Sequence, residues 1–386
     1  MTLTCNVCGQ ILQSPLYQSP DHLSITTMNK LIEGHTRVYF CDSCSHLQTS
    51  ALPDLERYYA EEYEINLASE DDDQLYKVSD GQPIYRAEHQ ADVLRAKINF
   101  SAGARVLDYG CAKSATMRKL LKNNSQIVPF LFDITDKYIP FWERLPKKPQ
   151  WSVATPEPSW AGSMDVVLSF YALEHVADLQ AALSNVRKLL KTGGTFYFIV
   201  PNVYESIADF IVADHINHFS KQSLHHLLGR AGFVDINVDD KVHDAAFVVD
   251  AKLAAAPVSL PKQDESAAAA CRQQAAQMAQ YWTDIVGKIR TFESSLAADT
   301  VTMIYGAGFY GHFIFSTLKV PGRIVCFVDQ NQHLQGTSIH GKPVVSPDVL
   351  PAEVSVIFVA LNPRIARDVI GAVKAFKGTT LNFFYL

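Results

Sequence analysis

Four cysteines near the N-terminus have the spacing of a metal-binding module. Cys5 and Cys8 form one CxxC pair, and Cys41 and Cys44 form a second pair after a gap of 32 residues. Four thiolates can surround one ion in a tetrahedron, which is the geometry of structural zinc sites and leaves no position for water. In a reducing cytosol, paired cysteines favour a metal over a disulfide. We therefore expect a structural Zn²⁺, with free thiols or a redox pair as the alternatives.

Carboxylates follow two predicted strands in the middle of the chain. The short apolar strand that ends at Asp108 runs into Gly110 and Ala112, and Asp133 ends the next strand, 25 residues beyond Asp108. A turn from strand to helix lets backbone amides approach a polar ligand closely. A carboxylate at the end of the second strand can accept hydrogen bonds from two ribose hydroxyls. The pattern indicates a site for a nucleotide-type cofactor.

Histidines gather after the predicted strand at residues 195–200. Asp214, His215 and His218 precede a helix that is expected to begin near Lys221, with Ser220 as its N-cap. A segment in this place lies at the carboxyl ends of the sheet, where ligands bind in open α/β sheets. Imidazole titrates near neutral pH and can act as a general base. Alternatively, the two histidines are satisfied within the loop and help to cap the helix.

A glycine turn lies near the C-terminus. Gly306, Gly308 and Gly311 follow a predicted strand and open a helix, and Asp329 ends the next strand, 18 residues past Gly311. This is the context of a dinucleotide-binding fingerprint. Taken alone, the pattern predicts bound NAD and an oxidoreductase.

Alternating helices and strands must position all of these residues. Strand and helix signals alternate from about residue 85, and the alternation restarts at residue 300. It predicts an α/β fold with a doubly wound, mostly parallel sheet, followed by a smaller α/β domain. Ser266 to Leu296 is rich in helix formers and predicts one or two long helices, and Tyr58 to Asp80 is interpreted as a connecting loop. The expected domains are 1–75 for the cysteine module with its loop, 76–256, 257–299 for linker helices, and 300–386.

Several elements of the first α/β domain can be delimited from apolar runs and spacing. Its expected strands are Arg105–Asp108, Ile127–Phe132, Met164–Phe170 and Thr195–Val200, and its expected helices are Gln90–Phe100, Thr116–Lys122 and Leu179–Leu190.

Bulk composition excludes some classes of protein. The chain has 386 residues, 48% of them apolar and 19% charged, with a net charge of −6. That charge argues against a general binder of nucleic acid, which needs clustered Lys and Arg. No segment approaches the roughly 20 apolar residues that span a bilayer, and the first residues do not form a targeting signal. We expect a soluble, cytoplasmic protein without nucleic-acid or membrane partners.

The first α/β domain resembles the class I methyltransferases. The segment around Asp108 and Gly110 is similar to their first motif, V-L-D-x-G-C-G-x-G, although Ala112 and Ser114 stand where glycine is usual. The stretches 165–176 and 187–202 are similar to the family's fourth and fifth strands with their loops. The resemblance implies a class I methyltransferase sheet and S-adenosylmethionine as cofactor. The implied cofactor-binding residues are Asp108, Gly110, Ala112, Asp133 and Tyr171.

The order of cysteine module, methyltransferase domain and C-terminal Rossmann-like domain resembles the deoxysugar C-methyltransferases over nearly the whole chain. These enzymes deprotonate a carbon next to the ketone of a nucleotide-linked 4-keto-6-deoxysugar and methylate that carbon. Their pattern Tyr-His-Glu-His-x-x-Tyr-Phe-Ser aligns with the segment before the predicted helix: His215 keeps the position of the base, and Asp214 replaces the glutamate. Val212 replaces a tyrosine and His218 the later aromatic residue. His175 corresponds to a second histidine of that site.

The resemblance implies roles for further residues. His215, His175 and Asp214 are the expected catalytic residues, and imidazole and carboxylate suit proton abstraction and its orientation. The C-terminal domain is expected to close over the sugar nucleotide. The expected substrate-binding residues are Glu174, His218, Asn202, Gly306, Gly308 and Asn362.

The leading expectation is C-methylation of a nucleotide-linked 4-keto-6-deoxysugar at C3 or C5. O- or N-methylation of a related sugar is the first alternative, because residues 212 and 218 depart from the family pattern. Further alternatives are a non-catalytic nucleotide-sugar binding protein whose cofactor loop has decayed at Ala112 and Ser114, and an NAD-linked oxidoreductase.

Overall fold

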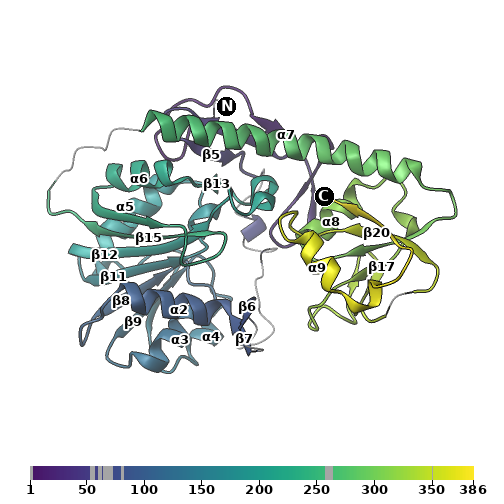
Figure 1. The fold of residues 1–386 in the computed structure, drawn as a ribbon. Coiled ribbons are helices and arrows are strands. Elements are labelled where there is room, and N and C mark those ends of the chain that lie inside the picture. Colours follow the sequence, from purple (N-terminus) through teal and green to yellow (C-terminus); the bar gives the residue numbers. More distant parts are fainter. Residues whose placement is uncertain are drawn as a thin grey trace. The chain divides into compact units, whose positions relative to one another are not determined.

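The computed structural model describes residues 3–52, 57–59, 63, 73–79, 82–256, 264–349 and 351–386, with the backbone alone for residues 78 and 79. The chain divides into two compact units, each made of discontinuous segments (Figure 1). Unit 1 comprises residues 1–14, 39–205 and 215–272, and unit 2 comprises residues 15–38, 206–214 and 273–386.

Unit 1 is built on a seven-stranded sheet with the order β10-β9-β8-β11-β12-β15-β14. The first five strands in this order are parallel, and β15 pairs antiparallel with both β12 and β14. This mixed sheet confirms the expected α/β class and is the class I methyltransferase arrangement. The strands are β8 Arg105–Tyr109, β9 Val128–Asp133, β10 Gln150–Val153, β11 Met164–Phe170, β12 Leu190–Pro201, β14 Phe233–Asp239 and β15 Ala246–Leu253.

Helices cover both faces of this sheet, as the ribbon of unit 1 shows (Figure 1). Successive residues of a strand point to opposite faces, and the core follows this rule. Leu107 and Val167 pack in the cluster that contains residues of α5 and α6, whereas their neighbours Val106 and Leu168 pack in the cluster of α2, α3 and α4. The helices are α2 Arg86–Lys97, α3 Ala115–Asn123, α4 Ile139–Trp142, α5 Leu179–Leu189 and α6 Lys221–Arg230.

The segments between the N-terminus and α2 form short strands. Residues 23–25 form β2 and residues 37–41 form β4, and the stretch interpreted as a connecting loop contains one strand of a hairpin, β6, in its described part. In unit 1, β5 pairs with β4 and with β13. The strands are β1 Tyr17–Gln18, β2 Leu23–Ile25, β3 Leu31–Glu33, β4 Arg37–Cys41, β5 His46–Thr49, β6 Leu75–Ser79, β7 Gln82–Tyr85 and β13 Asn217–His218.

Unit 2 contains a second α/β sheet, with the order β18-β19-β17-β16-β20-β21. Its core includes Met303, Tyr305, Ile357 and Ile370. The predicted long helical region is one 31-residue helix, α7, which belongs to unit 2 from Gln273 onward. The strands are β16 Val301–Tyr305, β17 Ile324–Val328, β18 Ser338–Ile339, β19 Lys342–Val345, β20 Val354–Val359 and β21 Asn382–Tyr385, and the helices are α7 Glu265–Ser295, α8 Phe309–Thr317 and α9 Ala366–Ala372.

Two segments from earlier in the chain complete unit 2. The hairpin of β2 and β3 lies in residues 15–38, and the short helix η4, Ile207–Ile211, lies in residues 206–214. Ile25 forms a parallel bridge with Val212. None of the helices in the described part of the chain is both long and apolar enough to cross a membrane.

Candidate active site

The parallel strands of unit 1 bring four of the predicted residues to one edge of the sheet. β8, β9, β11 and β12 run in the same direction, so their carboxyl ends lie together. Asp108 is near the end of β8, Asp133 ends β9, and Tyr171 and Asn202 directly follow β11 and β12. This edge is where ligands bind in sheets of this type.

The turn after β8 leaves no room for a side chain at Gly110. Its φ is +70°, a left-handed conformation that favours glycine, and a Cβ atom there would lie 2.9 Å from the Cβ of Ala172. The next turn residues are not glycines, yet Ala112 and Ser114 also have left-handed φ values of 44° and 56°. The loop therefore takes left-handed conformations at two positions that are not occupied by glycine.

Asp108 is buried beneath this loop. It is 2% exposed, and its Oδ2 accepts a 2.6 Å hydrogen bond from the hydroxyl of Ser114. Its Oδ1 has no hydrogen-bond partner among the described residues. Burial, together with the nearby charge of Asp133, raises the pKa of the Asp108 carboxyl to about 7, against the lowering effect of the Ser114 bond. A buried acceptor of this kind suits a ligand that carries donors or positive charge.

Asp133 retains the acceptor capacity that a ribose diol requires. Its Oδ2 accepts a 2.7 Å hydrogen bond from the amide of Ala112, and its Oδ1 accepts one from the amide of Thr135 at 3.3 Å. Burial raises the pKa of this carboxyl, and the backbone hydrogen bonds oppose that shift. An ionised carboxylate has about four lone-pair positions, so its backbone partners leave room for a donor from a ligand. The residues present therefore fit an adenosine-type cofactor.

Tyr171 packs among aromatic and basic groups next to the cofactor loop. It has a left-handed φ of 52°, and the guanidinium of Arg86 lies 4.9 Å from the centre of its ring. Its hydroxyl is 3.5 Å from Nε2 of His243. Burial lowers the pKa of His243 to about 4, so this imidazole is neutral near pH 7. No sequence pattern had singled out His243.

Three of the predicted substrate-site residues converge. Glu174 and His175 lie on the short helix η3, Leu173–His175, and His215 follows the unit boundary at residue 214. Their ligand-type atoms all lie within 4.8 Å of one another. The rings of His175 and His215 meet edge to face with their centres 4.6 Å apart. Glu174 and His215 are buried and His175 is half-buried, so the group combines two imidazoles and a carboxylate with limited access to water.

Two tyrosines that sequence reasoning missed complete this cluster. The hydroxyl of Tyr59 lies 2.9 Å from Nδ1 of His175, and that of Tyr63 lies 3.3 Å from its Nε2. Both belong to the stretch interpreted as a connecting loop. The available signal was the group of aromatic residues at 58, 59 and 63, close to the cysteine module. We refer to Tyr59, Tyr63, Glu174, His175 and His215 as the histidine cluster.

Asn217 holds the helix that carries Glu174 and His175. Its side-chain amide donates to the carbonyls of Leu173, at 3.0 Å, and Val176, at 2.7 Å. Its Oδ1 accepts from Asn6 at 2.9 Å. The buried side chain of Asn217 thus connects the η3 turn to the cysteine module, and no sequence motif predicted this role.

The other predicted residues of this region face different partners. Nε2 of His218 lies 2.8 Å from the hydroxyl of Thr49, and His218 itself is buried in the pairing of β13 with β5. In unit 2, both carboxylate oxygens of Asp214 accept hydrogen bonds from Thr27. The side chain of Asn202 accepts from the amide two residues further along the chain.

The predicted residues of the C-terminal domain lie at the carboxyl edge of the sheet in unit 2. Gly306 and Gly308 form the turn from β16 to α8, and Asn362 follows β20. Asp329 accepts a 2.8 Å hydrogen bond from the amide of Ala307. The side chain of Asn362 accepts from the amide of Arg364 at 3.1 Å.

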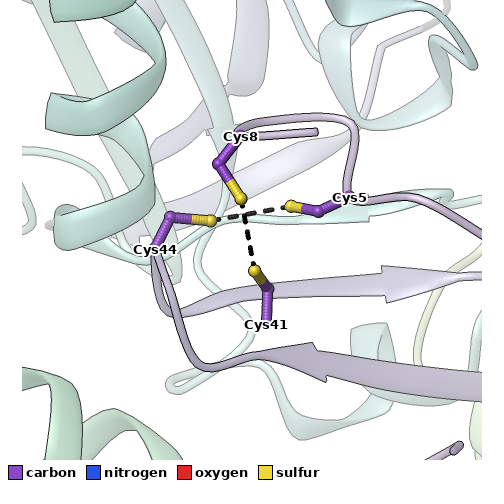
Figure 2. A group of neighbouring side chains, drawn as sticks. All are labelled: Cys5, Cys8, Cys41 and Cys44. Atoms are coloured by element: carbon purple, nitrogen blue, oxygen red, sulfur yellow. Dashed lines mark hydrogen bonds between the residues drawn. The ribbon is translucent and has the colours of Figure 1, made fainter. Parts of the chain in front are cut away.

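The four cysteines form one buried group in unit 1 (Figure 2). Cys5 and Cys44 have their sulfurs 3.6 Å apart, and Cys8 and Cys41 have theirs 3.4 Å apart. Each CxxC motif forms a tight turn. The amide of Gly9 donates to the carbonyl of Cys5, and the amide of Ser45 donates to the carbonyl of Cys41. The sulfurs are too far apart for disulfides, whose S–S bonds measure about 2.05 Å, and they converge as a tetrahedral ligand set would.

Comparisons with known proteins agree with this geometry. Residues 85–238 match a family model described as "Methyltransferase domain". The chain contains a methyltransferase domain. This match confirms the expected enzyme class and supports S-adenosylmethionine as the methyl donor. The matched residues run from β7 to β14 and include the cofactor loop, Asp133, the η3 turn and His215.

Solved structures similar to this chain are methyltransferases that align with less than half of it. The CurJ carbon methyltransferase is 17% identical, with a TM-score of 0.37 over 44% of this chain and 54% of that chain. A SAM-dependent methyltransferase from Archaeoglobus fulgidus is 19% identical, with a TM-score of 0.36 over 44% and 95%. Human N-acetylserotonin methyltransferase, in complex with SAM, is 14% identical, with a TM-score of 0.37 over 43% and 52%. No curated protein matches the sequence.

Proposed function

We propose that this chain is an S-adenosylmethionine-dependent C-methyltransferase that acts on the carbon next to the ketone of a nucleotide-linked 4-keto-6-deoxysugar, at C3 or C5. The observation that carries the proposal is the histidine cluster, which lies in the same unit as the methyltransferase cofactor loop. Methylation at carbon requires removal of a weakly acidic proton, and a buried imidazole in a cluster that also contains hydroxyl donors suits that task.

The residues of the cluster divide the chemistry between them. His215 accepts the proton from the carbon next to the ketone, and the electron pair of the broken C–H bond passes to the ketone oxygen. A tyrosine hydroxyl at His175 supplies a donor for that oxygen. Val212 is buried and apolar where the related enzymes have a tyrosine, so Tyr59 or Tyr63 takes over the hydroxyl that position 212 lacks.

Asp133 and the cofactor loop hold the methyl donor. Asp133 would accept from the ribose hydroxyls with the lone pairs that its backbone partners leave. When bound, S-adenosylmethionine supplies an electrophilic methyl group and leaves as the thioether. The protein would place the substrate carbon in line with this methyl group, and such placement can provide much of the rate.

We further infer that Cys5, Cys8, Cys41 and Cys44 bind one Zn²⁺ as a structural ion. Four thiolates about 2.3 Å from a tetrahedral zinc lie about 3.8 Å from one another, close to the 3.4 and 3.6 Å found here. All four side chains are buried, so no water reaches a coordination position. Elemental analysis should find one zinc per chain, and Cys41→Ser should lose it together with much of the thermal stability.

The decisive experiment uses S-adenosylmethionine labelled with carbon-13 in its methyl group and a panel of nucleotide-linked 4-keto-6-deoxysugars, read by NMR. A new methyl signal bonded to a ring carbon, together with exchange of the substrate's carbon-bound proton in D₂O, supports the proposal. A methoxy or N-methyl signal would instead favour O- or N-methylation. No transfer to any member of the panel would count against this substrate class.

A variant of the base isolates its role. His215→Ala should reduce turnover at least about 100-fold, since general bases contribute about 10²–10⁴-fold, with unchanged affinity for S-adenosylmethionine by calorimetry. His225→Ala is the matched control, because this half-buried histidine lies on α6 outside the cluster. Activity of His215→Ala near that of the wild type would remove His215 from the catalytic role.

A further inference from the structure

The gap of 32 residues between the two cysteine pairs contains a hairpin that a metal-binding knuckle does not need. The sulfurs of Cys8 and Cys41 lie 3.4 Å apart, so the excursion begins and ends at the same cysteine group. Between them, residues 15–38 pack as part of unit 2 together with residues 206–214. The insertion thus belongs to unit 2, where it packs with residues 206–214, a segment that is distant in sequence.

The hairpin is itself held by buried hydroxyls. Ser24 donates to the carbonyl of Gly34 at 2.9 Å, and Thr36 donates to the hydroxyl of Ser24 at 2.8 Å. Ser24 and Thr36 are both buried. The turn between β2 and β3 is therefore presented from a fixed base.

The turn of this hairpin forms hydrogen bonds with residues 212–214. The amide of Ala213 donates to the carbonyl of Ile25 at 2.9 Å, next to the bridge between Ile25 and Val212. The amide of Thr27 donates to Oδ1 of Asp214 at 2.6 Å, and the Thr27 hydroxyl lies 2.9 and 2.8 Å from the two carboxylate oxygens. Asp214 is fully buried, and a buried carboxylate is costly without such donors. Three hydrogen-bond contacts from one residue therefore hold Asp214 in one conformation.

His215 is the next residue along the chain, and its other flank is also fixed. The amide of Thr49 donates to the carbonyl of Ile216 at 2.9 Å, and β13 begins at Asn217 with its pairing to β5. The backbone of His215 is thus held by Asp214 on one side and by Ile216 on the other. Its ring meets that of His175 with the ring centres 4.6 Å apart.

We propose that Thr27 is a positioning residue for His215, acting through the carboxylate of Asp214, and that the insertion between the cysteine pairs serves to deliver it. This inference rests on the proposed function insofar as His215 is taken to be the base. Asp214 then acts on the backbone that leads into the base. A misplacement of about 1 Å at a catalytic group can reduce the rate about 100-fold, so the hydroxyl of Thr27 should influence the chemical step without contacting substrate.

Thr27→Val removes the hydroxyl and keeps the side-chain shape and the backbone amide. It should lower kcat about 10- to 100-fold, while KM for the sugar nucleotide and the affinity for S-adenosylmethionine change less than about 2-fold. Proton exchange of the substrate in D₂O should fall in parallel with kcat. Thr27→Ser, which restores the donor, should recover kcat to within about 3-fold of the wild type.

Thr36→Val is the matched control for damage to the hairpin. It deletes a hydroxyl of the same insertion that is more buried than that of the exposed Thr27, and its partner is Ser24 rather than Asp214. It should lower thermal stability as Thr27→Val does but leave kcat near that of the wild type. A kcat for Thr27→Val equal to that of the wild type, or an equal loss of kcat in both variants, would overturn the proposal.

A second readout separates this proposal from the function on which it rests. In protein labelled with carbon-13 at the histidine rings, the signal of His215 is assigned by its absence from His215→Ala. Thr27→Val should shift that signal and Thr36→Val should not, whether or not a sugar is turned over. An unmoved signal refutes the positioning role, whereas a shifted signal in a protein that methylates no ketosugar would leave the positioning role standing and refute the proposed reaction.

Discussion

The two units of this chain contain the same turn built with different residues. In unit 1 the turn joins β8 to α3, and in unit 2 it joins β16 to α8. In each case the carboxylate that ends the next strand accepts a hydrogen bond from the turn: Asp133 from the amide of Ala112 at 2.7 Å, and Asp329 from the amide of Ala307 at 2.8 Å. Each carboxylate also accepts from the amide two residues further along.

The two turns differ in how many of their positions require glycine. In unit 2 a Cβ atom on Gly306 would lie 2.2 Å from the carbonyl oxygen of Ala360, and one on Gly311 would lie 2.2 Å from the carbonyl oxygen of Gly306. These glycines are required by the packing of the unit itself. In unit 1, Ala112 and Ser114 take left-handed conformations without being glycine, and the turn covers a buried carboxylate.

This difference shows that a glycine pattern can indicate close packing of the backbone rather than a ligand site. The more conspicuous fingerprint, at Gly306 to Gly311, is largely explained by close approach of the backbone within unit 2. The turn within the matched methyltransferase region is the one with fewer glycines. Gly308 is the exception in unit 2, since a Cβ atom there would meet nothing within 4 Å, and it is the position at which a ligand could approach the backbone.

The largest expected effect tests the packing origin of Gly306. Gly306→Ala should destabilise unit 2 by about 4 kcal/mol, because overpacking adds to the strain of a left-handed φ of 107°. Chemical denaturation of the full chain measures the change. Gly308→Ala is the control and should stay within about 1 kcal/mol of the wild type. Equal stabilities of the two variants would show that packing does not explain the glycines of this turn.

The buried carboxylate of unit 1 should make stability depend on pH. The pKa of Asp108 is about 7 in the folded state, raised by burial from 3.8. The folded state therefore keeps this proton more tightly than the unfolded state does. The resulting stability is complete below about pH 4 and is lost as the pH rises through 7, with up to about 3 kcal/mol lost between pH 5 and 8.

Denaturation of the ligand-free protein at several pH values between 5 and 8 checks this expectation. Asp108→Asn cannot ionise and should lose the decline, so that it becomes more stable than the wild type at pH 8. Asp165→Asn is the control: the pKa of Asp165 is lowered by its hydrogen bonds to Lys191 and Arg105, against the effect of burial, so it titrates below this window. A decline that persists in Asp108→Asn would assign the pH dependence to other groups.

Substitution of Asp133 and of Asp329 should show which of the two units binds the cofactor. Asp133→Asn should weaken binding of S-adenosylmethionine by about 2 kcal/mol, or roughly 30-fold, because one acceptor for the ribose diol is lost. Asp329→Asn makes the same change in the equivalent turn of unit 2 and should leave the affinity unchanged. Calorimetric titration of both variants decides between the turns, and a loss in Asp329→Asn alone would place the cofactor in unit 2.

Local patterns predicted the elements of the first domain well. The expected strand from Met164 to Phe170 coincides with β11, because a mostly apolar run suits a strand buried on both faces. Ser220 does cap α6, where its side chain accepts from the amide of Ser223. Both results depend on residues within one turn or one strand, which a sequence displays directly.

Contacts between distant residues could not be predicted in this way. Thr27 and Asp214 are 187 positions apart, and neither has a neighbouring pattern that names the other. Asn217 donates to two backbone carbonyls of the η3 turn. Every residue has a backbone carbonyl, so a sequence does not show which ones a side chain will bind. The proximity of His175 to His215 was implied by family resemblance, whereas Tyr59 and Tyr63 were obscured by an acidic stretch interpreted as a loop.

The smallest expected effect concerns the residue that makes the first turn atypical. Ala112 has a left-handed φ of 44°, a conformation that costs an L-residue about 1–2 kcal/mol relative to glycine. Glycine at this position gains chain entropy in the unfolded state, which offsets part of that difference. Ala112→Gly should therefore stabilise the protein by only about 0.5 kcal/mol, as measured by chemical denaturation.

Ala112→Gly also tests whether the loop can bind S-adenosylmethionine with alanine, rather than glycine, at position 112. The amide of Ala112 donates to Asp133, and its carbonyl accepts from the indole of Trp142 at 2.6 Å. Both contacts belong to the backbone, so Ala112→Gly should preserve them and leave the affinity for S-adenosylmethionine within about 2-fold of the wild type. A gain of 10-fold or more would mean that alanine obstructs the cofactor, and the departure from the family motif would then mark a loop that has partly lost its ligand.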